Sequence, residues 1–207
     1  MYEAIPTQQY QKFVATMVKD LKNIPVEPPL FKERETVLDY LSLNHKIENV
    51  LEIGTLAGDF AEEILNRIKP KQLDLIDTFN WDDWEHSGNK QRFLKEDHFA
   101  FVSNRFVNKP VTIFKGLSHE VLRSMETKTY DFIYLDSDHT YECVSNELLE
   151  IDRFCKIGTI IGFDDYNVRQ VQAAATQWLS RNPKWKVLYL AFGQHGMTNL
   201  FIEKISI

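Results

Sequence analysis

The sequence is poor in cysteine, and it has no apolar run long enough to span a bilayer. Its two cysteines, Cys143 and Cys155, are too few for a disulfide framework and wrongly spaced for a zinc knuckle. We expect both thiols to be reduced, buried and carried by one helix. The first residues lack the charged leader and apolar stretch of a secretory signal, which favours a cytoplasmic protein with no membrane partner.

A cluster of Lys and Arg is also missing, and the formal net charge is −6 at pH 7. A nucleic-acid backbone requires a basic face, so the composition argues against a nucleic-acid partner and favours a small molecule. The content of 43% apolar and 26% charged residues is typical of a soluble globular protein. A length of 207 residues fits a single domain, which we expect to consist of an N-terminal helical cap over 1–45 and a core over 46–207.

Strand and helix patterns alternate along the chain. Expected strands cover 50–53, 73–77, 111–114, 130–135, 159–163, 187–192 and 198–202, and expected helices lie near 10–21, 34–43, 60–68, 119–125, 144–154 and 168–179. Gly158 is expected to follow the end of the fifth of these helices. Such repeated units predict a parallel sheet with helices on both faces. The last two strands flank Gly193–Gly196 and predict a closing hairpin, with His195 at its tip.

The most informative segment runs from Val50 to Gly58, where a buried strand enters a glycine-marked turn and a helix follows at once. Gly54 allows a tight turn at the strand end, and Gly58 allows the helix to start close to the sheet and a ligand. Asp77 ends the next strand, at the distance where a carboxylate meets ribose hydroxyls. Together these features predict a nucleotide-cofactor loop.

Five parallel strands followed by a hairpin distinguish this plan from the six-stranded sheet of dinucleotide dehydrogenases. Over residues 50–202 the chain resembles class I S-adenosylmethionine-dependent methyltransferases, with Glu52, Gly54 and Gly58 matching the Glu/Asp-x-Gly-x-x-x-Gly loop of that family. Leu56 departs from the pattern, because many members carry a further glycine there. The resemblance implies an α/β, Rossmann-like, seven-stranded sheet of order 3-2-1-4-5-7-6 with one antiparallel strand and helices on both faces.

The same resemblance implies S-adenosylmethionine as the cofactor. The residues it assigns to cofactor binding are Glu52, Gly54, Thr55, Gly58, Asp77, Gly116, Leu117, Ser118 and Asp136. Within this set Asp77 would meet the ribose, and the loop from Gly116 to Ser118 would lie near the adenine.

Two acid-rich tips follow the fourth and fifth strands, which are neighbours in the strand order of that family. Asp136 lies in the first tip, and Asp164 and Asp165 lie in the second. The three carboxylates are therefore expected to converge. Carboxylates in one small volume repel one another unless a cation lies among them. An oxygen-only ligand set favours Mg²⁺, with Mn²⁺ or Ca²⁺ as alternatives.

This arrangement resembles the metal-dependent O-methyltransferases, of the catechol and caffeoyl-coenzyme A type and of the antibiotic and sugar tailoring type. Asp136 and His139 match the Asp-x-x-His run of the tailoring enzymes, and Asp164 and Asp165 match their acidic pair. The resemblance implies Asp136, Asp164 and Asp165 as metal ligands, with Asp136 and His139 as catalytic residues. A bound dication lowers the pKa of a substrate hydroxyl, and His139 takes its proton as general base.

Several alternatives stay open. The same fold can act without metal if Asp136 and His139 orient a substrate directly. A nicotinamide-dependent oxidoreductase and a non-catalytic binding module or dimer are the rivals from other classes. The long stretch 78–108, with Trp81, Trp84, His86 and His98, is predicted to form a substrate or partner surface. We expect a small hydroxylated substrate and a homodimer.

Overall fold

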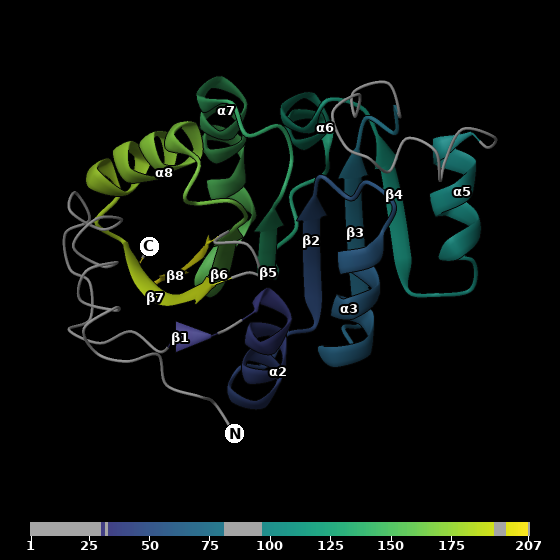
Figure 1. Cartoon of the computed structure of the whole chain (residues 1–207), viewed down its shortest axis with the longest axis horizontal. Helices are drawn as coiled ribbons and strands as arrows, with labels where there is room; N and C mark the ends of the chain where they lie inside the picture. Colours follow the sequence, from purple (N-terminus) through teal and green to yellow (C-terminus); the bar gives the residue numbers. More distant parts are fainter. Residues whose placement is uncertain (1–29, 32, 81–96, 193–197, 207) are drawn as a thin grey trace.

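The protein is organised around one sheet of mostly parallel strands. The computed structural model describes residues 30–31, 33–80, 97–192 and 198–206. Their strands are β1 (Leu30–Phe31), β2 (Asn49–Ile53), β3 (Gln72–Asp77), β4 (Val111–Lys115), β5 (Tyr130–Leu135), β6 (Cys155–Phe163), β7 (Trp185–Phe192) and β8 (Thr198–Lys204). They lie in the order β1-β7-β8-β6-β5-β2-β3-β4. The strands β2 to β5 run in one direction, so their carboxyl ends gather at one edge of the sheet (Figure 1).

The predicted strand order 3-2-1-4-5-7-6 is confirmed, since it corresponds to β4-β3-β2-β5-β6-β8-β7. The strand β8 is antiparallel to both β6 and β7, as expected from the closing hairpin. A short strand that the sequence did not predict, β1, pairs in parallel with β7 and makes the sheet eight-stranded. All six residues of β5 are buried, because helices cover the sheet on both faces.

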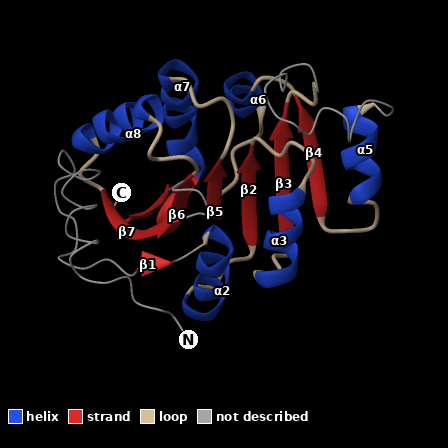
Figure 2. Ribbon diagram, viewed as in Figure 1, coloured by secondary structure: helices blue, strands red, loops and turns tan. Residues whose placement is uncertain are grey.

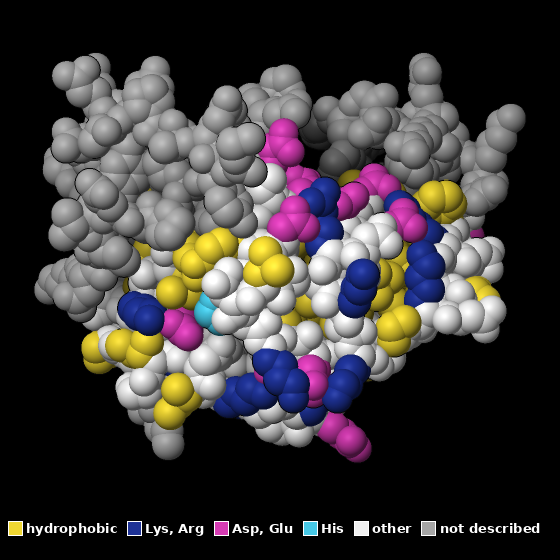
Figure 3. Space-filling view, turned by 90° about the horizontal axis from the view of Figure 1, so that it is seen from below, with side chains coloured by type: hydrophobic (Ala, Val, Ile, Leu, Met, Phe, Trp, Pro, Cys, Tyr) yellow, Lys and Arg dark blue, Asp and Glu magenta, His cyan; other side chains and the backbone are white. Residues whose placement is uncertain are grey.

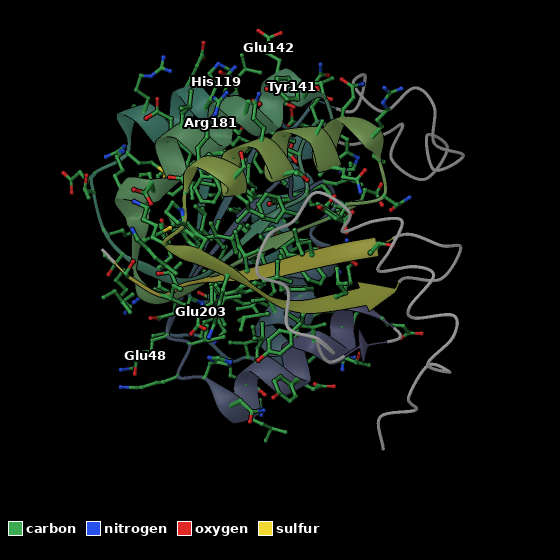
Figure 4. The ribbon with its side chains drawn as sticks, turned by 90° about the vertical axis from the view of Figure 1, so that its left-hand side faces the viewer. Glu48, His119, Tyr141, Glu142, Arg181 and Glu203 are labelled. Carbon is green, nitrogen blue, oxygen red and sulfur yellow. The ribbon has the colours of Figure 1, made fainter. Side chains whose placement is uncertain are left out.

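Helices form a layer on each face of the sheet (Figure 2). They are α2 (Arg34–Asn44), α3 (Asp59–Arg67), α5 (His98–Arg105), α6 (Ser118–Ser124), α7 (Tyr141–Ile151) and α8 (Arg169–Arg181). The apolar side chains of α2, α3 and α5 belong to one core cluster, and those of α6, α7 and α8 belong to the other. Seen from the side of the hairpin, α7 and α8 lie above β7 and β8, while α2 lies below (Figure 4).

Two sequence predictions are wrong in detail. The helix α7 ends at Ile151, and after one 3-10 turn the strand β6 begins at Cys155, so the two cysteines do not share a helix. Gly158 therefore lies within β6 and does not follow a helix end. Both thiols are free; Cys155 is buried and Cys143 is partly exposed.

The helix α5 was not predicted, and it places His98 on a helix inside the stretch 78–108. The predicted helix over 10–21 lies outside the described residues, as do Trp81, Trp84 and His86. The same holds for His195 at the hairpin tip.

The edge where the strands begin carries paired charges. In Figure 3, which shows this edge, Lys and Arg side chains lie among Asp and Glu side chains. Lys46 and Lys71 both contact Glu48, at 2.9 and 3.0 Å, and Lys156 contacts Asp131 at 2.6 Å. The pairs of the exposed Lys46 and Lys71 stabilise the fold little, whereas Asp131 is buried. No described helix has both the length and the apolar character required to cross a membrane.

Candidate active site

A cavity of about 620 Å³ opens at the carboxyl edge of the sheet, where the loops after β2, β3, β4 and β5 meet. Open α/β sheets bind ligands at this edge, where the strand order reverses, and here it reverses between β2 and β5. The lining contains the predicted cofactor residues Glu52, Gly54, Thr55, Asp77, Gly116, Leu117, Ser118 and Asp136. Gly58 is the one predicted cofactor residue that does not line it.

Gly54 forms the turn that ends β2. Its φ is +88°, and its amide donates to the carbonyl oxygen of Ile76 at 2.8 Å. A Cβ at this position would lie 1.9 Å from the carbonyl oxygen of Asp136. Only glycine therefore fits, and it lets the loop after β2 lie directly against the loop after β5.

Gly58 allows the start of α3 to pack closely. It is the N-cap of α3 with φ +83°, and a Cβ there would lie 2.6 Å from the ring of Phe106, just beyond α5. The glycine thus allows α3 and the end of α5 to approach each other. Its contact with a cofactor stays a prediction.

Asp77 both faces the cavity and orders the loop after β2. Its carboxylate accepts hydrogen bonds from the amides of Leu56 and Phe79, each at 2.8 Å. Leu56 has φ +48°, a value that favours glycine, and His98 Nε2 donates to its carbonyl oxygen at 2.8 Å. The bonds with Asp77 and His98 hold Leu56 in this backbone conformation, at the position where many family members carry a glycine.

Glu52 is a buried carboxyl group on the cavity wall, with 1% of its surface exposed. Thr55 Oγ1 donates to it at 3.3 Å. Burial, together with the nearby Asp136, raises the pKa of Glu52 well above its usual range. A carboxyl group in this condition favours a cationic partner.

The loop after β4 forms another wall of the cavity. Gly116 continues the sheet contact by donating to the carbonyl oxygen of Asp77 at 2.9 Å, and Leu117 beside it remains half-exposed. Ser118 begins α6 and lies 3.9 Å from Cys143 Sγ, measured from its Oγ. A small polar side chain and an exposed apolar side chain thus stand side by side at this wall.

The acidic residues predicted from the strand tips do come together. The amide of Asp164 donates to the carbonyl oxygen of Leu135 at 2.8 Å, which joins the two tips. His139 lies between carboxylates, with Nε2 3.6 Å from Asp136 Oδ1 and Nδ1 3.5 Å from Asp165 Oδ2. Ligand atoms of Asp136, His139 and Asp164 all lie within 4.8 Å of one another. Asp136 lines the cavity, whereas Asp164, Asp165 and His139 do not.

Arg34, which the sequence analysis did not single out, lies between two of these carboxylates. It is the first residue of α2, and its Nη1 donates to Asp136 Oδ2 at 2.9 Å and to Asp164 Oδ1 at 3.0 Å. Asp164 Oδ1 also accepts hydrogen bonds from the hydroxyl of Tyr134 at 2.7 Å and from the amide of Asn199. The guanidinium thus supplies a positive charge inside the acid cluster.

The charged groups of the cluster change one another's pKa values. Burial and the neighbouring Asp164 raise the pKa of Asp136. Burial also acts to raise the pKa of Asp164, but Arg34 and the hydrogen bonds from Tyr134 and others outweigh it, so that pKa is lowered. Asp136, helped by the other carboxylates, raises the pKa of His139 above its ordinary 6.5.

The donor set, as arranged, does not fit a divalent cation bridging Asp136 and Asp164. The oxygens that face each other, Asp136 Oδ2 and Asp164 Oδ1, both accept from Arg34 Nη1. An ion between them would require the guanidinium to leave. Within the part of the chain that the structure describes, Asp165 Oδ1 and His139 Nε2 are buried without a hydrogen-bond partner, and Arg34 does not satisfy them.

The role of Arg34, and the contact that His98 makes with Leu56, escaped sequence reasoning for the same reason. Arg34 is separated from Asp136 by 102 positions and His98 from Leu56 by 42, and neither stands in a motif. The acid-rich tips do signal a missing positive charge, but 24 Lys and Arg residues qualify as its source. Only the fold identifies which one reaches the site.

Comparison with known proteins identifies the family. Residues 51–166, more than half of the chain, match the family described as a methyltransferase domain. The sequence has no significant match among curated proteins.

Solved structures share the fold at low identity. The O-methyltransferase from Bacillus cereus in complex with SAH is 16% identical, covers 97% of this chain and 92% of its own, and has a TM-score of 0.59. The O-methyltransferase TomG from Streptomyces achromogenes, in complex with SAM, is 14% identical over 98% of this chain and 92% of its own, with a TM-score of 0.61. The N-methyltransferase NodS from Bradyrhizobium japonicum, in complex with SAH, is 16% identical over 84% of this chain and 86% of its own, with a TM-score of 0.57.

The sheet order, the glycine turn after β2 and the matched residues agree, and the chain belongs to the methyltransferase domain family with a Rossmann-like methyltransferase fold.

Proposed function

We propose that this protein binds S-adenosylmethionine in the cavity and methylates a hydroxyl group of a small molecule, with His139 as general base. The observation that carries the proposal is the position of the His139 imidazole between Asp136 and Asp165, next to a cavity that Asp136 itself lines. An imidazole held in this way accepts a proton near neutral pH.

The charges of the cavity favour a cationic cofactor. Five acidic residues line it: Glu52, Asp59, Asp77, Asp136 and Asp138. Arg34 is the one Lys or Arg among the described lining residues. A sulfonium with an ammonium group suits such a wall, whereas the two phosphates of a nicotinamide dinucleotide would meet like charges. The cavity therefore favours S-adenosylmethionine over the nicotinamide rival.

The chain's own residues suit the parts of that cofactor. Asp77 is placed to accept hydrogen bonds from hydroxyl groups, and the buried Glu52 is suited to an ammonium group. When bound, S-adenosylmethionine supplies an electrophilic methyl group. His139 takes the proton of the acceptor, and Asp136 and Asp165 stabilise the resulting imidazolium. No side-chain nucleophile is needed.

Oxygen is the proposed methyl acceptor because the similarity to O-methyltransferases runs over nearly the full chain. The two solved O-methyltransferases cover 97% and 98% of this protein, and the N-methyltransferase NodS covers 84%. A neutral hydroxyl also needs a base more than most amines do, and His139 can act as one.

Dependence on Mg²⁺, Mn²⁺ or Ca²⁺ is the second form of this proposal. It is favoured by the ligand atoms of Asp136, His139 and Asp164, which lie within 4.8 Å of one another. The bonds of Arg34 to both carboxylates speak against it. Turnover measured in EDTA, and again with each ion restored, separates the two forms.

The proposal is tested by following S-adenosylhomocysteine formation with a panel of small hydroxylated acceptors and matched amines. We expect transfer to hydroxyl groups, and we expect His139→Gln to lower kcat by about 10² to 10⁴ with little change in cofactor affinity. His119→Gln, which changes a histidine outside the cluster, is the matched control. Transfer to amines alone, or an unchanged rate in His139→Gln, contradicts the proposal.

A further inference from the structure

We propose that Arg34 is the resident cation of the acid cluster, taking the place of a divalent ion and making methyl transfer independent of metal. This inference rests on the proposed function, because the cluster holds the base His139. It adds a positioning residue that no sequence motif marks.

The contacts of Arg34 are those of a bridging cation. One nitrogen, Nη1, donates to Asp136 Oδ2 at 2.9 Å and to Asp164 Oδ1 at 3.0 Å, and it lies 3.4 Å from the hydroxyl of Tyr134. Both carboxylates are therefore oriented by the same donor. Charge-assisted bonds of this kind are the strong class of protein hydrogen bonds.

Arg34 is held in place from its other sides. Its guanidinium carbon lies 4.5 Å from the ring centroid of Phe60 and 5.9 Å from that of Tyr134, within range of cation–π attraction. The helix that carries it, α2, buries Val37 and Leu38 completely in the core. A side chain that packs on two adjoining rings and is carried by an anchored helix is not a free surface arginine.

The position of Arg34 conflicts with a metal ion at the same carboxylates. A dication between Asp136 and Asp164 would compete for the oxygens that Nη1 occupies, and its charge would repel the guanidinium. Since rings and helix hold Arg34, the arginine and the ion are mutually exclusive at this point. The chain thus carries its own cation within the cluster.

Arg34 also orders the residues that hold the base. It fixes Asp136 through Oδ2, while the other oxygen of Asp136 lies 3.6 Å from His139. One carboxylate therefore joins the cation to the imidazole. With Arg34 in place, His139 is left to act on a proton and is not needed as a metal ligand.

Binding of Mn²⁺ alone, measured by electron paramagnetic resonance and calorimetry, tests the inference directly. We expect the wild-type protein to bind Mn²⁺ no more tightly than Asp136→Asn does. Arg34→Met removes the charge but keeps an apolar chain against Phe60, and we expect it to bind one Mn²⁺ at least tenfold more tightly than wild type. Arg67→Met is the matched control, because Arg67 pairs with Asp39 and Glu63 on the surface. A single Mn²⁺ site of equal affinity in wild type and Arg34→Met overturns the inference.

Thermal unfolding gives a second readout that a merely structural role would not produce. Arg34→Met should melt at lower temperature than wild type, since it leaves Asp136 and Asp164 facing each other, and added Mn²⁺ should raise its Tm while leaving the wild-type Tm unchanged. If Arg34→Met does not fold, Arg34→Lys replaces it, and this variant should exclude Mn²⁺ as wild type does. A rise in the wild-type Tm with Mn²⁺ contradicts the inference.

Binding of S-adenosylhomocysteine to the same proteins separates the two proposals. A wild type that fails to bind it refutes the proposed function, while the Mn²⁺ comparison retains its meaning. A wild type that binds it but needs Mg²⁺ or Mn²⁺ for turnover refutes only the role of Arg34.

Discussion

Among the described glycines, Gly54 is the one whose would-be Cβ meets the closest contact. A Cβ would overlap the backbone of Asp136 at 1.9 Å, and neither loop can retreat without breaking strand-end hydrogen bonds. Gly158 has the same φ of +88° but no atom within 4 Å of its would-be Cβ. Comparing Gly54 with Gly158 therefore separates the free-energy cost of a left-handed backbone conformation from that of a steric collision.

We therefore predict unequal losses from two alanine substitutions. Gly158→Ala should lower the free energy of unfolding by about 1–2 kcal/mol, the cost of the left-handed conformation. Gly54→Ala should lower it by more than about 4 kcal/mol, because a buried collision is added. Urea unfolding measures both, and losses of the same size would contradict the predicted contact with Asp136.

A second residue-scale prediction concerns pH. The carboxylates raise the pKa of His139 above 6.5, and a base acts in its neutral form, so kcat/KM should rise with pH through an apparent pKa above 6.5. The raised pKa of His139 stabilises the fold at low pH, and this contribution is lost as pH rises through that pKa. Asp136, whose own pKa is raised to about 7, titrates in the same range. Rate profiles and unfolding curves of wild type and His139→Gln check this. A wild-type profile with no ascending limb above pH 6.5 would contradict the role of His139.

Some site residues were predictable from the sequence and others were not. Asp136 and Asp164 each follow directly on a strand, and His139 lies in the loop after Asp136. Parallel strands end at one edge of the sheet, so the convergence of these residues was predictable. Arg34 comes from a helix that no pairing rule ties to that edge. Its contacts depend on how α2 packs, which only the full fold determines.

At the scale of elements, α5 fastens the loop that follows β2. Arg105, the last residue of α5, donates to the carbonyl oxygen of Ala57 at 2.7 Å and to Asp59 Oδ1 at 2.6 Å. At the other end of α5, His98 donates to the carbonyl oxygen of Leu56 at 2.8 Å. One helix thus binds Leu56 and Ala57 of the candidate cofactor loop and Asp59 at the start of α3.

Arg105→Met should accordingly weaken cofactor binding without unfolding the protein. We expect a loss of about 1.5–3 kcal/mol in S-adenosylhomocysteine affinity, the usual range for hydrogen bonds to charged groups. Arg123→Met is the control, since Arg123 is an exposed residue of α6 that pairs with Glu150. Calorimetric affinities equal to wild type in Arg105→Met would show that α5 does not order this loop.

The helix α5 was not predicted from the sequence, and the reason is local. Its apolar residues Phe99, Phe101 and Val102 do not form the regular stripe that marked the other helices. The helix is set by Asp97, whose side chain accepts from the Ala100 amide at 2.8 Å, and by the burial of Val102. The central strands β2, β3 and β5, by contrast, were predictable because their apolar runs are almost entirely buried.

Across the whole molecule, the sheet separates two kinds of surface. The edge where strands begin has exposed, paired charges, and the edge where they end has a cavity with five acids and Arg34. Acidic residues therefore outnumber basic ones at the edge where the cofactor is proposed to bind, in a protein with a net charge of −6. The predicted homodimer and cytoplasmic location remain predictions.

The most direct test of the whole account is calorimetric titration of the wild-type protein with S-adenosylhomocysteine and, separately, with NAD. An acidic cavity built for a cationic cofactor predicts one saturable site for S-adenosylhomocysteine, no measurable binding of NAD, and loss of the first when Asp77 is replaced by alanine. Binding of NAD, or no binding of S-adenosylhomocysteine, would contradict the account.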